Sequence, residues 1–522
     1  MKNYSWEQTQ KKYSDWLSKC NLKKKICSEI KFNDLSIWWL TNLVNRDNVN
    51  NQNWYKDLHN ILNNKKIEGN YNFLYAKFFV VFLKNLILKL LFTLHINFFL
   101  KIKNNTFYNV KNCYHSFFIN LSLVKGNYVD RQYGLTHFRD KEKAVYLVYL
   151  YENKNLFTNF FKIKKKLKNL KLQYKILNAE IKIFEIFKIY YLVFKYFLQI
   201  LKLIKYNKYF LIGKKDCQKI LKYQLLMSFA GSIQDQLLTG YSLKKNLEKN
   251  KFDNFISYME FYPGARCIYY FAKKSNIKNI ISINHTAYFK NNLFYSFNSS
   301  DFSSKDFSSH YSPHPDIFIC QGDKYYQKLI KIFDKKKVHK VGNLKIELDN
   351  SLKIKNRNTR KKIKKSLLIL CSLNDYKPFI NILNKCDLSN FNIYVLPHPY
   401  NRNRTIVDFK KNFLNEFSIG NSSSRLNLIN KVDYVIFSSS SLGFQLSIIK
   451  KNVIRIFDKK EIPTCDLNQE IPTTNNYKTV QKFLKMKIIK QNPKTLIKNY
   501  FYKYDNKSSF RFVDKLKVLK FL

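Results

Sequence analysis

Four consecutive serines, Ser438, Ser439, Ser440 and Ser441, come directly after a predicted strand at 433–437 and directly before a predicted helix with Gly443 in its first turn. Backbone N–H groups at the start of a helix, with serine hydroxyls beside them, form a site that suits a phosphate group. Serines at this position also cap ordinary helices without binding any ligand. The four serines therefore predict either an anion site or a helix cap.

A histidine, His398, stands between Pro397 and Pro399 at the end of the predicted strand 392–396. Its imidazole can donate a hydrogen bond to a phosphate or to a ribose hydroxyl, although a lone histidine at such a turn is often structural. Open α/β sheets bind ligands at the carboxyl ends of their strands. Because the serines and His398 both follow strands of one predicted lobe, we expect them to converge on one pocket.

The elements that must position these residues form two α/β units behind a helical region. All nine prolines lie at or after Pro263, so residues 1–240 can hold long helices and are predicted to be mainly helical. Short apolar runs then alternate with polar helical stretches, which is typical of βαβ units. The predicted strands are 255–261, 280–284, 316–320 and 338–341 in the first unit and 366–371, 392–396, 433–437 and 453–457 in the second.

We therefore expect an α/β protein with two Rossmann-like lobes and a largely helical N-terminal region. The predicted lobes are 241–350 and 366–480, with a basic linker at 351–365 between them and a basic helical tail at 481–522.

The 522 residues include 93 Lys and Arg against 36 Asp and Glu, a net charge of +57. Such a charge attracts anionic partners, whether nucleic acid or acidic lipid headgroups. The lysines are spread along the whole chain, as codon drift in an AT-rich genome would leave them, and no RRM or KH signature accompanies them. We therefore expect no specific nucleic acid as a partner.

Two apolar stretches, 73–100 and 186–204, are candidates for membrane contact. Lys77, Lys84 and Lys89 interrupt the first, whose longest uncharged piece is too short to span a bilayer. In the second, lysines recur every seven residues and form one stripe of a helix that could lie on an anionic membrane surface. The first stretch is therefore expected to be an amphipathic or buried helix, and a core helix with one solvated lysine face is the alternative for the second.

The polar first residues are unlike a signal peptide, and the nine cysteines are scattered without a C-x-x-C pair. These features favour a reducing compartment. We expect a cytoplasmic protein, either free or peripheral on the inner face of the plasma membrane.

Several segments, taken in order, resemble bacterial surface carbohydrate biosynthesis proteins, a family similar to the GT-B-type glycosyltransferases that include polysialyl-, Kdo- and polyol-phosphate transferases. The matching segments are SIWWLTNLV at 36–44, YMEFYPGAR at 258–266, SINHT at 282–286, DIFICQGDKYYQKL at 316–329, VGNLKIE at 341–347, PHP at 397–399 and SSSS at 438–441. The resemblance implies two lobes of GT-B type. The first would hold the acceptor, and the second would bind the nucleotide of an activated donor sugar.

The resemblance also implies roles for single residues. Glu260 or His285 would take the proton of the acceptor hydroxyl, unless Glu260 is instead a structural acid paired with Arg266. The residues that would hold the donor nucleotide are Gly342, Asn343, Lys345, His398, Pro399, Ser438, Ser439, Ser440, Ser441 and Gln445. This arrangement requires no metal and no cofactor.

The expected function is transfer of a sugar from a nucleotide-activated donor, with CMP- and CDP-linked sugars as first candidates, onto a lipopolysaccharide, capsule or related surface glycan. The expected partners are this donor, a glycan or lipid-linked glycan acceptor and an anionic membrane surface. Gln445 and Ala265 replace acids that the family usually carries. They leave open a catalytically decayed protein that binds glycan or acts as a scaffold, and a nucleic-acid-binding protein is the further alternative.

Overall fold

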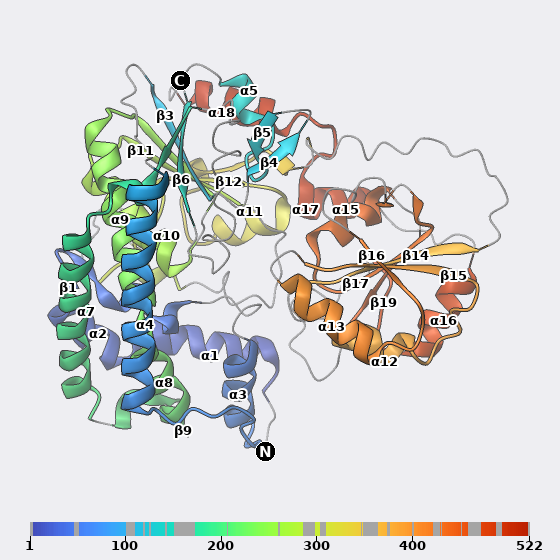
Figure 1. Ribbon diagram of the computed structural model, residues 1–522, viewed down its shortest axis with the longest axis horizontal. Helices are drawn as coiled ribbons and strands as arrows, with labels where there is room; N and C mark the ends of the chain where they lie inside the picture. Colours follow the sequence, from blue (N-terminus) through green and yellow to red (C-terminus); the bar gives the residue numbers. More distant parts are fainter. Residues whose placement is uncertain are drawn as a thin grey trace.

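Two parallel sheets, of seven and six strands, organise the computed structural model of the chain (Figure 1). The model describes residues 4–45, 52–100, 110–117, 121–124, 127–140, 144–150, 173–205, 207–258, 261–284, 298–302, 310–345, 347, 364–372, 376–398, 401–420, 428–429, 431–449, 452–457, 471–486 and 493–519. The predicted α/β class, with two Rossmann-like lobes and a largely helical N-terminal region, is confirmed.

The first lobe is built on the seven-stranded sheet, whose order is β13-β12-β11-β10-β3-β6-β7 with every pair parallel. Its strands are β3 (Asn112–Phe117), β6 (Ala144–Tyr149), β7 (Tyr174–Ile176), β10 (Asn254–Ser257), β11 (Asn279–Ile283), β12 (Ile317–Cys320) and β13 (Val338–Lys340). The strands β3, β6 and β10 are buried along their whole length, as expected of a parallel sheet covered on both faces.

Three strands of this sheet, β3, β6 and β7, come from the region that the sequence predicted to be helical. The segments NCYHSF and AVYLVY are buried on both faces, so they lack the alternation that distinguishes a half-exposed strand. Periodicity alone does not separate such short buried segments from buried helix. The first lobe therefore begins about 130 residues before the predicted boundary at 240, at residue 112.

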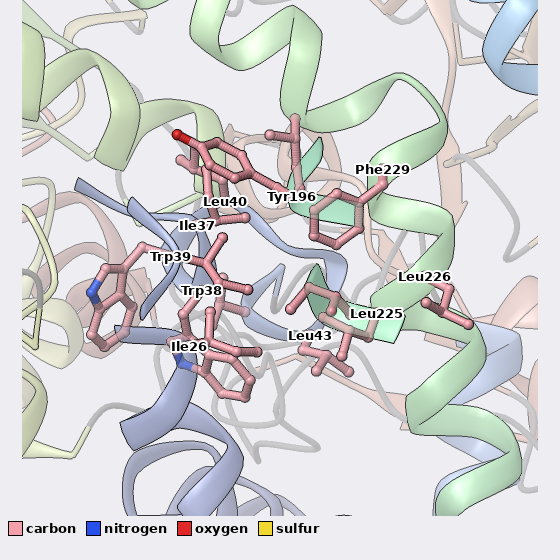
Figure 2. Close-up of a cluster of buried hydrophobic side chains, with 14 of the residues drawn as sticks. Ile26, Ile37, Trp38, Trp39, Leu40, Leu43, Tyr196, Leu225, Leu226 and Phe229 are labelled. Carbon is pink, nitrogen blue, oxygen red and sulfur yellow. The ribbon is translucent and has the colours of Figure 1, made fainter. Parts of the chain in front are cut away.

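The helical region packs beside this sheet and has its own hydrophobic core. Its helices are α1 (Trp6–Lys19), α2 (Asn21–Glu29), α3 (Gln52–Leu62), α4 (Tyr75–Leu94), α7 (Ile183–Leu203), α8 (Gln218–Met227) and α9 (Ser232–Lys249), with the 3-10 turn η1 (Ile37–Leu40) at the centre. Figure 2 shows Trp38, Leu40 and Leu43 grouped with Leu225 and Phe229. The helix α10 (Pro263–Lys274) packs along α9 and connects this core to the sheet.

The second lobe is built on the six-stranded sheet, whose order is β16-β15-β14-β17-β18-β19, again parallel throughout. Its elements are β14 (Lys365–Leu370), α12 (Lys377–Leu383), β15 (Phe391–Leu396), α13 (Arg402–Asn412), β16 (Ser418–Ile419), β17 (Tyr434–Phe437), α15 (Ser441–Ile449), β18 (Val453–Ile456), β19 (Thr473–Thr474) and α16 (Tyr477–Lys485). The chain fills one side of β14 first and the other side afterwards. This reversal makes the carboxyl end of β14 the topological switch point of the sheet.

The last two helices return to the first lobe. The helix α17 (Pro493–Phe501) contacts both α15 and α11 (Asp323–Leu329), and α18 (Ser508–Val518) packs on α5 (Thr136–Arg139) (Figure 1). Tyr500 of α17 connects the lobes directly: its ring lies 5.1 Å from that of Phe444, and Lys324 Nζ donates to its hydroxyl at 2.8 Å. The segment predicted as a basic tail thus fastens one lobe to the other.

Candidate functional site

Three neighbouring strands of the second sheet end at the same level. Leu370, the last residue of β14, pairs with Leu396 on one side and with Phe437 on the other. Adjacent strands lie about 4.8 Å apart, so the outer two strands end roughly 10 Å from each other. The loops that carry His398 and the serines therefore leave the sheet on the same edge, on either side of the switch point.

The serines form the connection between β17 and α15. Ser438, Ser439 and Ser440 are half-buried, Ser441 begins the helix, and the backbone N–H of Gly443 donates to the carbonyl of Ser440 at 2.9 Å. A Cβ at Gly443 would clash with the ring of Phe437, so the glycine lets the helix start directly over the end of the strand. The N-terminus of α15, which is the positive end of its helix dipole, therefore lies at the carboxyl edge of the sheet.

His398 lies two residues beyond β15 and is half-buried. Its carbonyl accepts a hydrogen bond from the backbone N–H of Asn401 at 3.1 Å, which turns the chain into α13. Burial lowers the pKa of His398 below its ordinary value, so the imidazole is neutral at pH 7 and offers one donor and one acceptor nitrogen. Arg402 donates through Nη1 to the carbonyl of Gly420 at 3.0 Å and so fastens the loop after β16.

Two further polar side chains lie on or beside α15, the helix that follows the serines. Gln445 is buried in the second turn of α15. Arg455 of β18 is buried, pairs in register with Phe437, and has its guanidinium carbon 5.8 Å from the Phe444 ring centroid. The predicted site does not include Arg455, although a lone cation within the apolar run VIRIF is a signal for it.

The corresponding edge of the first sheet is closed by a chain of buried amides. Gln321 Nε2 donates to the carbonyl of Asn284 at 2.6 Å, and Asn343 Nδ2 donates to Gln321 Oε1 at 3.1 Å. Asn343 Oδ1 accepts from the backbone N–H of Lys345 at 2.9 Å. These bonds join the ends of β11, β12 and β13. Asn343, predicted to contact the donor, therefore has its described contacts within the first lobe.

Gly342 and Lys345, also predicted at the donor site, have their described neighbours in the first lobe and the returning tail. Gly342 has a φ of +96°, and a Cβ there would lie 2.7 Å from Ser508 Oγ, so the glycine seats the start of α18. Burial raises the pKa of Asp130 to about 6, while a hydrogen bond from Ser116 and the charge of Lys345 oppose this rise. Lys345 thus acts electrostatically on the first lobe.

Arg266, on α10, is buried and contacts the Trp-rich segment. Its guanidinium carbon lies 5.3 Å from the Trp39 ring centroid, and Lys23 Nζ lies 4.8 Å from the same ring. These cation–π contacts give the segment SIWWL a packing role. Glu260, His285 and Pro399 lie outside the described residues. Glu260 and His285 follow the adjacent parallel strands β10 and β11 in the sequence.

No protein-family model matches the chain, and no curated protein matches it in sequence. Among solved structures, UDP-GlcNAc 2-epimerase from Neisseria meningitidis bound to UDP-GlcNAc is 12% identical, covers 78% of this chain and 100% of its own, and gives a TM-score of 0.42. The wall teichoic acid polymerase TagF is 12% identical, covers 85% of this chain and 98% of its own, and gives 0.40. Likenesses of this size carry no argument about the chain, and the fold assignment rests on the two sheets themselves.

Proposed function

We propose that this protein is a glycosyltransferase that moves a sugar from a nucleotide-activated donor onto a surface glycan. The observation that carries the proposal is the convergence of the His398 loop and the serine turn on either side of the β14 carboxyl end. The order of the PHP and SSSS motifs, which resembles that of GT-B-type transferases, supports the same assignment. The expected cytoplasmic location stays a prediction.

In this proposal the second lobe binds the donor's phosphates at the first turn of α15. The helix dipole, the serine hydroxyls and the neutral imidazole of His398 would each stabilise negative charge on the leaving phosphate oxygen. Arg455, buried one strand away, adds positive charge behind the turn. Gln445 would hydrogen-bond a ribose hydroxyl from α15.

The transfer itself needs a base on the acceptor side, and we assign this role to Glu260, with His285 as the alternative. The base takes the proton of the acceptor hydroxyl, whose oxygen forms a bond to the anomeric carbon while the bond from that carbon to the donor phosphate breaks. The acceptor in this proposal is a glycan or a lipid-linked glycan.

A thermal-shift panel of nucleotides and nucleotide sugars tests the donor site, beginning with CMP and CDP and continuing with UDP. A ligand that binds only the folded state raises the melting temperature. We expect at least one nucleotide to do so, and Ser440→Ala and His398→Ala to weaken its binding about tenfold each. Ser418→Ala is the matched control, because Ser418 is exposed on the edge strand β16 of the same sheet.

Unchanged nucleotide binding in both variants would refute the assignment of the site. The replacement of the usual glutamate by Gln445 favours a second candidate, a decayed transferase that binds without turnover. Nucleotide binding without consumption of any nucleotide sugar in the presence of a glycan acceptor would identify that case.

A further inference from the structure

Helices α4 and α7 form an antiparallel pair on the outside of the helical region (Figure 1). The rings of Phe78 and Phe197 stack with centroids 4.1 Å apart, and Phe82 meets Tyr190 at 5.3 Å. These contacts fix which side of each helix faces the other.

The outer side of this pair is apolar and exposed. Six large side chains, Val80, Leu83 and Ile87 on α4 and Phe184, Phe187 and Tyr191 on α7, are each more than half exposed, from 51% for Phe187 to 73% for Tyr191. We call these six residues, with the lysines that border them, the α4–α7 face. Soluble monomers rarely expose contiguous apolar surface of this kind without a partner for it.

The lysines of the two helices border this surface on both sides. Successive helical residues are turned by about 100°, so position in the sequence gives the order around each helix. On each helix, the order that runs outward from the partner helix begins with apolar residues and ends with two lysines. On α4 this order is Phe79, Leu83, Ile87, Val80, Leu91, Lys84 and Lys77. On α7 it is Phe194, Phe187, Leu198, Tyr191, Phe184, Lys195 and Lys188. Because the pair is antiparallel, both orders run toward the same side of the molecule. An apolar band thus lies between two rows of exposed lysines.

The negative charges are turned away from this face. The segment of α4 contains no acidic residue. The acidic residue of α7, Glu185, is paired with Lys245, and Lys89 points inward to Asp235, with Nζ and Oδ1 at 2.9 Å. The α4–α7 face therefore presents only positive charge beside its apolar band.

We propose that the α4–α7 face docks on an anionic lipid bilayer, with both helices parallel to the membrane surface. Apolar side chains would insert at the boundary between headgroups and acyl chains, and the lysines would extend to the lipid phosphates. This inference does not depend on the proposed donor site, which lies in the other lobe.

The packing of α4 favours a helix that lies on the membrane over one that crosses it. Among the described residues, Tyr75–Phe98 is long and apolar enough to span a bilayer by length and composition. Its inner side is nevertheless part of the protein core: Phe78 is fully buried, and Asn85 Nδ2 donates to the carbonyl of Ala230 at 2.6 Å. Insertion across a bilayer would break these contacts and the pair between Lys89 and Asp235.

A second copy of the chain is a less suitable occupant of the face. In a two-fold dimer the same surface meets itself, so the lysine rows of the two copies would be brought close together. Like charges at such short range oppose association. An anionic bilayer complements both the apolar band and its borders.

Co-sedimentation of the full chain with vesicles tests the proposal. We expect binding to vesicles of equal parts phosphatidylcholine and phosphatidylglycerol, and at least tenfold weaker binding to pure phosphatidylcholine. The triple variant Lys84→Glu, Lys188→Glu, Lys195→Glu and the double variant Leu83→Asp, Tyr191→Asp should each lose at least tenfold in binding. The control variants Lys385→Glu, Lys410→Glu, Lys411→Glu and Leu414→Asp change exposed residues of the second lobe and should bind as the parent does.

Melting temperatures of all variants show whether the fold is retained, and the triple lysine variant decides if the apolar variant does not fold. Equal loss in the controls, or no binding to the anionic vesicles, would overturn the proposal. A concentration-dependent dimer that Leu83→Asp abolishes would assign the face to a second copy instead. Because nucleotide thermal shifts depend on the second lobe, failure of membrane binding and failure of the proposed donor site can be distinguished.

Discussion

The two parallel sheets use their carboxyl edges in opposite ways. At the first sheet, Gln321 and Asn343 tie strand ends together, and Gly342 seats the returning C-terminal helix. At the second sheet, half-buried serines and a half-buried imidazole follow the strand ends. The comparison shows that two sheets of the same strand order can carry different chemistry at their carboxyl edges, because the loops after the strands differ.

The largest expected effect on stability comes from a substitution at Gly342, at the carboxyl edge of the first sheet. Alanine there meets both a strained φ of +96° and the Ser508 hydroxyl at 2.7 Å, so we expect Gly342→Ala to lower the free energy of unfolding by about 3 kcal/mol. Gly213→Ala is the control, since Gly213 has a φ of +62° with Lys12 Nζ as its nearest neighbour at 3.9 Å. It should cost about 1 kcal/mol. Calorimetry of both variants measures the difference, and equal losses would mean that the tail does not press on Gly342.

Acid should lower the stability of the first lobe through His115 of β3. This side chain is fully buried, and neither ring nitrogen has a hydrogen-bond partner within the described part of the chain. Burial lowers its pKa from 6.5 to about 3. The unfolded chain therefore takes up the proton first, and stability is lost as the pH falls from 6.5 toward 3.

At pH 4.5 this loss amounts to about 2.5 kcal/mol from His115. The variant His115→Phe retains an aromatic ring without a titrating group, so its stability should fall less steeply with acid. Urea unfolding of both proteins at pH 7 and pH 4.5 gives the comparison. The raised pKa of Asp130 acts in the opposite direction, but it is common to both proteins and cancels in the difference. Parallel pH profiles would rule out a neutral, buried His115.

A smaller loss of stability is expected when the chain of buried amide hydrogen bonds is broken. In Gln321→Leu, the carbonyl of Asn284 and the amide of Asn343 each lose a buried hydrogen bond, which should cost about 2 kcal/mol. Gln481→Leu is the control in the second lobe, where Gln481 Oε1 accepts from the backbone of Asp387 at an exposed position. It should cost less than about 1 kcal/mol. Equal effects in denaturant titrations would mean that the buried amide chain contributes no more to stability than an exposed hydrogen bond.

The smallest expected effect on stability concerns the serine turn at the carboxyl edge of the second sheet. If the serine turn is kept for a ligand, Ser440→Ala should change the free energy of unfolding by less than about 0.5 kcal/mol in the absence of nucleotide. A helix cap at this position would instead cost about 1 kcal/mol or more. Thermal unfolding of the apo protein therefore separates the two interpretations of the serines.

The sequence predicted the second lobe closely because its strands are short apolar runs separated by polar helices. The expected strand 366–371 is β14 (Lys365–Leu370), and the expected strand 392–396 lies within β15 (Phe391–Leu396). Since His398 and the serines follow such strands directly, their placement on one edge followed from strand order alone.

Features that depend on contacts distant in sequence could not be predicted in this way. The strands β3 and β6 are buried on both faces and show no period of their own. Gly342 has its role only because Ser508 packs on it, 166 residues later in the chain. The exposed band on α4 and α7 likewise depends on which sides of two distant helices face inward.

Tyr500 links α15 of the second lobe to α11 of the first lobe. Its ring rests on Phe444 of α15, and its hydroxyl is held by Lys324 of α11. A shift of α15 that keeps this ring contact must either carry α11 along or break that hydrogen bond. A reporter group on α11 would therefore register a displacement of a helix that belongs to the opposite lobe.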